Sequence, residues 1–291
     1  MPLYPMRCSY QALGIFLIIN QVLSTSQLLH EKVLESQLLH EKVLESLPGG
    51  VRHLSQASCN LVIKVVSFED ETHLRELECF FPSDGIFRSI ENKPSWLLER
   101  LSNNQIASNI DTLHMSQALL YDTIISIPAG ADIYIEEGDG NQNPDGRRLQ
   151  TGSRSTIALR IVGTDVATTM NVALLGDEIF GASGDSYNLR SQYLACSFDQ
   201  LDFTPAVQSG VTNGIFQVTP PNLSATGTDH AVFRNAVVNE GNAQLGTMSS
   251  AFKNVMLCFP PGVTFNGSTN WVAYAYVNSY LSVYNDNWCG R

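Results

Sequence analysis

Short apolar segments rich in valine and isoleucine alternate with segments of Gly, Asn, Ser and Thr through much of this chain. β-Branched and aromatic residues fit the pleated surface of a strand, so each apolar segment predicts a strand and each polar one a turn. A different pattern places Leu189, Gln192 and Tyr193 on one face and predicts a helix over 187–195. A further short helix is expected over 95–105. The predicted strands cover 60–68, 76–81, 124–127, 132–136, 155–162, 214–219 and 255–259.

The run 271–284 consists mainly of Val, Ala, Tyr, Leu and Trp and contains no Pro, Gly or formal charge. It predicts one or two buried strands, or a strand that enters a tight turn at Asn278-Ser279. Such a segment needs partners on both faces, yet only a turn and a cysteine follow it, so we expect the domain to continue beyond Arg291. Its aromatic residues are expected to pack in a core rather than to line a sugar or peptide groove. They are Trp271, Tyr274, Tyr276, Tyr280 and Tyr284.

The N-terminus has the pattern of a secretory signal peptide, which we place at 1–26. Arg7 supplies the positive flank, residues 12–19 form a short apolar core, and small residues follow it. The apolar run is about half the ~20 residues that a membrane span needs, so no stable span is expected. The decapeptide SQLLHEKVLE then occurs twice in succession, which predicts a loosely held helical segment over 27–50.

Composition narrows the function classes. The chain is 44% hydrophobic and 15% charged, which is typical of a folded protein rather than a disordered one. Its formal net charge of -11 argues against nucleic-acid binding, which needs a basic surface. Together with the signal peptide, these features predict a secreted, extracellular protein.

Secretion makes the cysteines candidates for disulfide bonds. Cys8 would leave with the signal peptide. The first two of the remaining cysteines lie in the N-terminal half and are expected to pair, and one of the last three is expected to be left over, as if its partner were absent. Asn222 and Asn266 each begin an N-x-S triplet and are glycosylation candidates. The five disulfide candidates are Cys59, Cys79, Cys196, Cys258 and Cys289.

Residues 138–150 form a polar linker that contains two candidate sites. Oxygen-bearing side chains alternate in it as they do in calcium loops, but Pro144 stands where an EF-hand loop needs glycine. A plain linker is the favoured interpretation, with a calcium-stabilised adhesive module as a weaker one. The pair Arg147-Arg148 is either a processing site or a solvated charged pair. The calcium candidates are Asp139, Asn141, Asn143 and Asp145.

Linked motifs in the second half resemble the gametolysin family of secreted zinc metallopeptidases, in the form associated with algae and diatoms. They lie between residues 151 and 289 and read CFPPG, WVAYAYVN and SVYND-x-WC, preceded by DEIFG, NLRSQY, ACSF and FTPA. The resemblance implies an α+β fold. A β-rich prodomain over 51–137 would precede the upper part of a metzincin-like catalytic domain with a twisted mixed sheet over 151–291.

The resemblance also implies zinc, held by an HExxH helix that would follow the last motif. Two histidines four residues apart share a helix face and can bind one zinc ion, while the glutamate polarises its water. This sequence contains no HExxH, and no two of its histidines are four apart. Zinc is therefore expected for a full-length family member and not for this chain, and no catalytic or metal-ligating residue is assigned. His230, in a polar segment, is expected to face solvent.

Two functions follow from these observations. The first is a gametolysin-like zinc endopeptidase acting on extracellular-matrix or cell-wall glycoproteins, with this chain inactive as it stands. The alternative is a non-catalytic secreted or cell-wall-associated binding protein, a degenerate peptidase that retains the sheet without the chemistry.

Overall fold

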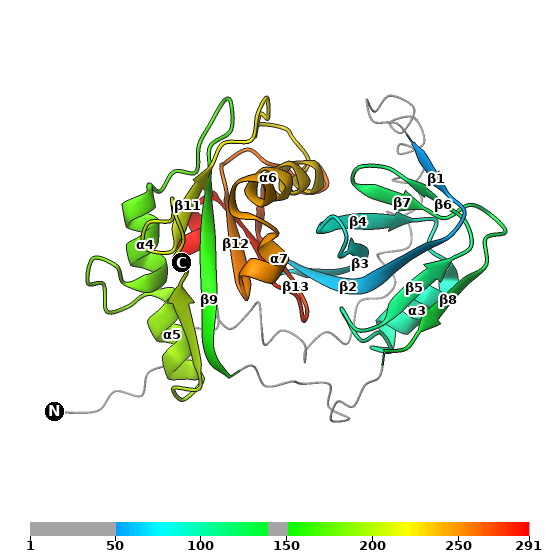
Figure 1. Ribbon diagram of the computed structural model, residues 1–291, viewed down its shortest axis with the longest axis horizontal. Coiled ribbons are helices and arrows are strands. Elements are labelled where there is room, and N and C mark those ends of the chain that lie inside the picture. Colours follow the sequence, from blue (N-terminus) through cyan, green and yellow to red (C-terminus); the bar gives the residue numbers. More distant parts are fainter. Residues whose placement is uncertain (1–50, 139–150, 291) are drawn as a thin grey trace.

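The computed structural model describes residues 51–138 and 151–290, and these residues form an α+β fold with a large mixed sheet and few helices (Figure 1). The predicted signal peptide, the duplicated segment and most of the predicted linker lie outside the described residues. The described strands join into one sheet of 14 strands. The expectation of an α+β fold with a mixed sheet is confirmed.

The C-terminal part is built around β9 (Gly152–Ile161), a strand with parallel neighbours on both sides. β10 and β11 pair with one edge of β9 and β12 pairs with the other. β14 continues the parallel set beside β12, and β13 is antiparallel to β14. These strands are β10 (Leu201–Pro205), β11 (Ile215–Val218), β12 (Asn254–Phe259), β13 (Trp271–Tyr276) and β14 (Leu281–Asn285).

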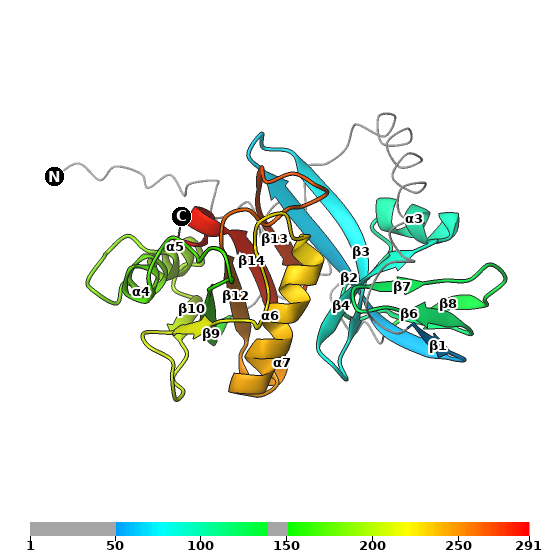
Figure 2. The same ribbon diagram turned by 90° about the horizontal axis from the view of Figure 1, so that it is seen from above.

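Helices cover both faces of this part of the sheet (Figure 2). On β9, Ile157 and Leu159 belong to the core that includes Phe233 and Val237 of α6, whereas Ala158 belongs to the core under α4. Alternate residues of a strand point to opposite faces, so β9 is buried on both sides. The helices are α4 (Val172–Phe180), α5 (Leu189–Cys196), α6 (His230–Leu245) and α7 (Met248–Ala251), and a 3-10 helix η2 (Asp286–Gly290) follows β14.

The N-terminal part is a set of antiparallel hairpins and short strands with its own core. Its central pair is β2 with β3, extended on the outer side of β3 by β4. The elements are β1 (Arg52–Leu54), β2 (Ala57–Phe68), β3 (His73–Phe81), β4 (Ile86–Glu91), α3 (Ser95–Ser102), β5 (Thr112–Met115), β6 (Ala118–Leu120), β7 (Ile124–Ser126) and β8 (Ile133–Glu136).

Strand β2 joins the two parts. Its inner edge pairs antiparallel with β13, from Trp271 opposite Phe68 to Tyr276 opposite Lys64. Its side chains alternate between two cores: Val62 packs with the α6 core, and Leu61 packs with the core of the N-terminal part. The predicted prodomain-like and peptidase-like regions therefore share one sheet and one strand that is buried on both faces.

The strand predictions match the structure more closely than the helix predictions do. The run 271–284 forms β13 and β14 around a turn, and its Trp271, Tyr274 and Tyr276 are buried. The predicted backing helix exists as α5, but none of its residues is fully buried. The helix that fills the core is α6, the longest among the described residues, which the sequence reading did not predict.

Candidate functional site

A cluster of charged side chains is buried where the N-terminal part meets α6. We call Lys64, Glu76, Glu78, His230, Arg234 and Tyr276 the junction cluster. Its members come from β2, β3, α6 and β13, and the register places Tyr276 and Glu76 on either side of Lys64. Lys64 and Arg234 are 0% exposed and Glu78 is 1% exposed. Charges this deeply buried must be paired, because transferring an unpaired charge from water into the core costs several kcal/mol of folding free energy.

Lys64 is the centre of the cluster. Its Nζ lies 2.6 Å from Glu76 Oε2, 2.7 Å from Glu78 Oε1 and 3.1 Å from His230 Nε2. It also lies 4.9 Å from the centre of the Phe265 ring, within the range of a cation–π contact. Burial alone would lower the pKa of Lys64, but Glu78 and Glu76 outweigh that effect and raise it, so the ammonium stays charged.

Arg234 holds α6 to the N-terminal part. Its Nη1 donates to Glu78 Oε2 at 3.1 Å and to the Tyr276 hydroxyl, and its Nη2 donates to the Phe87 carbonyl at 2.6 Å. Burial would raise the pKa of Glu78, but Lys64 and Arg234 outweigh it and lower that pKa. Burial raises the pKa of Tyr276 well above its usual value, so its hydroxyl stays protonated and donates to Glu78 Oε2 at 2.9 Å.

His230 corrects an expectation, because it does not face solvent. Asp229 caps α6 by accepting a hydrogen bond from Ala231 N at 2.8 Å, so His230 becomes the first helical residue. The residue is 6% exposed, and its ring lies 4.0 Å from the Phe265 ring, centre to centre. Burial, and then Lys64, lowers the pKa of His230, so the imidazole is neutral at pH 7.

The junction cluster has no arrangement for catalysis. It contains no serine, threonine or cysteine nucleophile beside a base, and its acidic and basic groups are paired with one another, with only Glu76 partly exposed. Its chemistry suits structural coupling of β2, β3, β13 and α6. A sequence signal for it existed: Lys64 is a lone charge within an apolar strand, and Glu76 and Glu78 alternate on the neighbouring strand. These residues were not predicted as a site.

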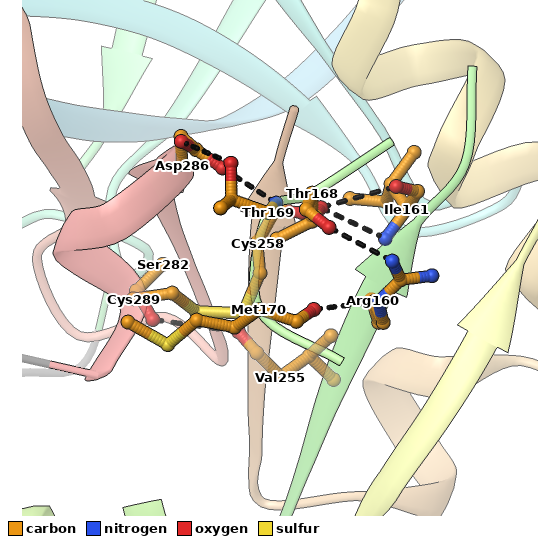
Figure 3. The surroundings of a disulfide bond; sticks show 10 residues. All are labelled: Arg160, Ile161, Thr168, Thr169, Met170, Val255, Cys258, Ser282, Asp286 and Cys289. Atoms are coloured by element: carbon orange, nitrogen blue, oxygen red, sulfur yellow. Dashed lines mark hydrogen bonds between the residues drawn. A yellow bond between two sulfur atoms is a disulfide. The ribbon is translucent and has the colours of Figure 1, made fainter. Parts of the chain in front are cut away.

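A second polar site lies at the carboxyl ends of the parallel strands, beside a disulfide bond (Figure 3). Cys258 of β12 is bonded to Cys289 of η2, and both are buried. Asp286 accepts from the backbone N and the hydroxyl of Thr169 at 2.8 Å each. Ligands often bind at this end of parallel strands. Here Asp286 is paired with Thr169 within the chain, which makes the site an anchor for η2.

The other disulfide candidates are also bonded. Cys59 of β2 is joined to Cys79 of β3, and the bond links two neighbouring antiparallel strands. Cys196 is disulfide-bonded as well, and no described cysteine is free. The expectation of a leftover cysteine is therefore not met. That expectation counted only the five cysteines after the predicted signal peptide.

A small hollow lies on the sheet face under α5, and three of the candidate groove aromatics, Tyr276, Tyr280 and Tyr284, line it together with Tyr193. Its cavity volume is about 30 Å³, enough for one or two water molecules. A sugar ring or a peptide side chain does not fit into this space. The hollow therefore gives no binding site of the size that a glycoprotein substrate requires.

The described residues do not fit a zinc ion. They contain no group of three or more His, Cys, Asp or Glu side chains placed to hold a metal. His230 is the only histidine among residues 151–290, and its two ring nitrogens face Lys64 Nζ and Asp229 Oδ2. The calcium candidates Asp139 to Asp145 and the pair Arg147-Arg148 lie outside the described residues.

The two glycosylation candidates lie on neighbouring loops. Asn222 and Asn266 are both exposed. Asn266 and Gly267 both have positive φ, 50° and 76°, and form the two-residue turn of a tight hairpin. The loops are joined by a hydrogen bond of 2.9 Å from Gly227 N to the Gly262 carbonyl. A glycan on each asparagine would extend from the same region of the surface.

We expect both asparagines to carry N-glycans when the chain is made in a secretory cell. Endoglycosidase treatment should lower the mass by two glycans in the wild type and by one in Asn222→Gln or Asn266→Gln. Ser268→Ala keeps Asn266 but breaks its triplet, so it should lose the same glycan as Asn266→Gln. An unchanged mass after enzyme treatment of the wild type would contradict this expectation.

No protein-family model matches the chain, and no curated protein is significantly similar to it. Within 51–138 and 151–290, no helix is long and apolar enough to cross a membrane.

Proposed function

We propose that this chain is a secreted scaffold of the gametolysin-like peptidase type that does not hydrolyse peptides by itself. One observation carries the proposal. The motifs of the resemblance fall on adjacent elements: CFPPG at the end of β12, WVAYAYVN on β13, and SVYND-x-WC on β14 and η2. A disulfide joins the first motif to the last. The motif residues thus build one framework, in which β12 and β14 are parallel neighbours and β13 is antiparallel to β14.

A mixed sheet is also what the resemblance implies for the upper part of a catalytic domain, and this agreement supports the proposal. The N-terminal part would correspond to the prodomain, and it remains attached through the pairing of β2 with β13. Secretion is supported by the disulfides Cys59–Cys79 and Cys258–Cys289, which form and persist in oxidising compartments. Matrix or cell-wall glycoproteins are the substrates that the resemblance implies for a complete enzyme.

The purified 291-residue chain should show no chelator-sensitive proteolysis, because no residues that fit zinc are present in the described part and no HExxH is present in the sequence. The assay would measure cleavage of casein and of a cell-wall glycoprotein extract, with added zinc and with a chelator. A trace of an active zinc endopeptidase added to a parallel sample establishes the detection limit. Hydrolysis by the purified chain that the chelator abolishes would overturn the proposal.

A non-catalytic binding protein is the second candidate, and the cysteines favour it. A degenerate peptidase that is stable without its chemistry should have no reactive thiol, and no described cysteine is free. Thiol titration under denaturing conditions, together with sedimentation of the native chain, distinguishes this second candidate from the first. A monomer without free thiol that binds immobilised cell-wall glycoprotein supports the binding protein, whereas an aggregating chain with a reactive thiol contradicts it.

A further inference from the structure

The imidazole of His230 lies where the first turn of α6 meets β2 and β13. Its Nε2 faces Lys64 Nζ at 3.1 Å, and its Nδ1 faces Asp229 Oδ2 at 3.3 Å. Phe265 and Tyr274 enclose the ring, with ring centres 4.0 Å and 5.4 Å away. Water therefore has little access to the imidazole, and its protonation state depends on these neighbours.

The contact with Lys64 requires a neutral imidazole. An ammonium group can only donate hydrogen bonds, so His230 Nε2 must accept, which places the ring proton on Nδ1 toward Asp229. A protonated imidazole carries a hydrogen on both nitrogens. Its Nε2–H would then point at a second cation 3.1 Å away in a site that excludes water. The contact cannot persist in that state.

The carboxylates around His230 do not remove this conflict. Glu76 and Glu78 of β3 contact Lys64, and Glu78 also contacts Arg234 of α6, whose charge further disfavours an imidazolium. Asp229 faces the ring directly, but its side chain is 47% exposed, so solvent screens its charge. The remaining titratable groups, on β13, are the hydroxyls of Tyr274 and Tyr276; burial raises the pKa of both, so they remain neutral.

We propose that His230 makes the joint between the N-terminal part and α6 sensitive to pH, holding it closed at neutral pH and loosening it in mildly acidic surroundings. The group that changes is the imidazole, and the elements that respond are the first turn of α6 and the β2–β13 pair against it. Such a response would let a secreted chain change shape where the medium becomes acidic.

The direction of the effect follows from linkage. An unfolded histidine has a pKa of about 6.5. Burial, and then Lys64, lowers the folded-state pKa of His230 below that value. Between the two values the unfolded chain binds more protons, so stability is complete above about pH 6.5 and decreases as the pH falls below it. One such group changes the unfolding constant by at most about tenfold per pH unit.

The test compares urea unfolding of the full chain and of His230→Gln between about pH 7.5 and 5.5, on either side of the histidine pKa. Glutamine is neutral throughout, and its amide oxygen can accept from Lys64. Below pH 6.5, each unit by which the pH falls should raise the unfolding constant of the wild type by up to about tenfold more than that of the variant. His53→Gln, which replaces an exposed histidine of β1 in the N-terminal part, should keep the wild-type slope.

Equal slopes for the wild type and His230→Gln would overturn the proposal. Should that variant fail to fold, the His230 ring proton of the wild type is titrated by NMR instead. A midpoint below that of an unfolded histidine, accompanied by chemical-shift changes in β2 and the first turn of α6, supports the proposal. A midpoint at or above the unfolded value contradicts it.

Discussion

Arg234→Met should lower the free energy of unfolding by about 3–5 kcal/mol, because removing one partner of a buried ion pair leaves an uncompensated charge. The lost guanidinium neutralises Glu78 and satisfies the carbonyl of Phe87. Methionine fills a similar length but donates no hydrogen bond. Urea unfolding at pH 7.5, followed by tyrosine and tryptophan signals, measures the change.

The matched control for this substitution is Arg190→Met. Arg190 pairs with Asp202 at 2.6 Å, but its side chain is 35% exposed, so the change should be at most about 1 kcal/mol. Adding Glu78→Gln to Arg234→Met should cost less than the sum of the two single changes, since both remove the same interaction. If Arg234→Met and Arg190→Met had equal effects, the junction cluster would not couple the two parts.

Replacing both Cys258 and Cys289 with alanine should lower the free energy of unfolding by about 3–4 kcal/mol. The disulfide links residues 31 apart and closes a loop in the unfolded chain. Without it the unfolded chain has more conformations, so its entropy rises and folding becomes less favourable. Both sulfurs are buried, so some packing is lost as well. Local exchange of backbone hydrogens should also increase in η2 and at the end of β12.

Thr169→Val separates the disulfide from the polar contacts beside it. That change removes one hydrogen bond to Asp286 and leaves the disulfide, so its effect should stay near 1 kcal/mol or less. An alanine pair as stable as the wild type would show that η2 is held by its other contacts alone.

Strands could be predicted from this sequence because their signal is local. Around Val62 and Ile157, apolar residues occupy consecutive positions rather than only every second one. Both strands are buried on two faces. The turn at Asn278 was also visible, since asparagine tolerates the positive φ of 56° that it adopts. Which strands pair could not be deduced in this way, because β2 and β13 are some two hundred residues apart along the chain.

Helix α6 escaped prediction for a physical reason. It buries Arg234 and Asn235 along with its apolar residues and exposes Val232, so polarity does not separate its two faces as it does in a typical surface helix. Those polar residues are buried because they contact β3, β4 and β13, and that information resides in segments distant in sequence. The buried position of His230 was missed with the helix, since its environment depends on Asp229 starting the helix there.

The joint between the two parts of the chain is the feature on which both the proposed scaffold and the proposed pH response depend. Its most direct test is a protease site inserted between residues 138 and 151 in a Cys196→Ser background, so that no disulfide of Cys196 can link the pieces. After cutting at neutral pH, the two pieces should elute together from a size-exclusion column and separate only in denaturant, because β2 pairs with β13 and Arg234 contacts Glu78. Pieces that separate under native conditions would contradict a shared sheet and a buried junction.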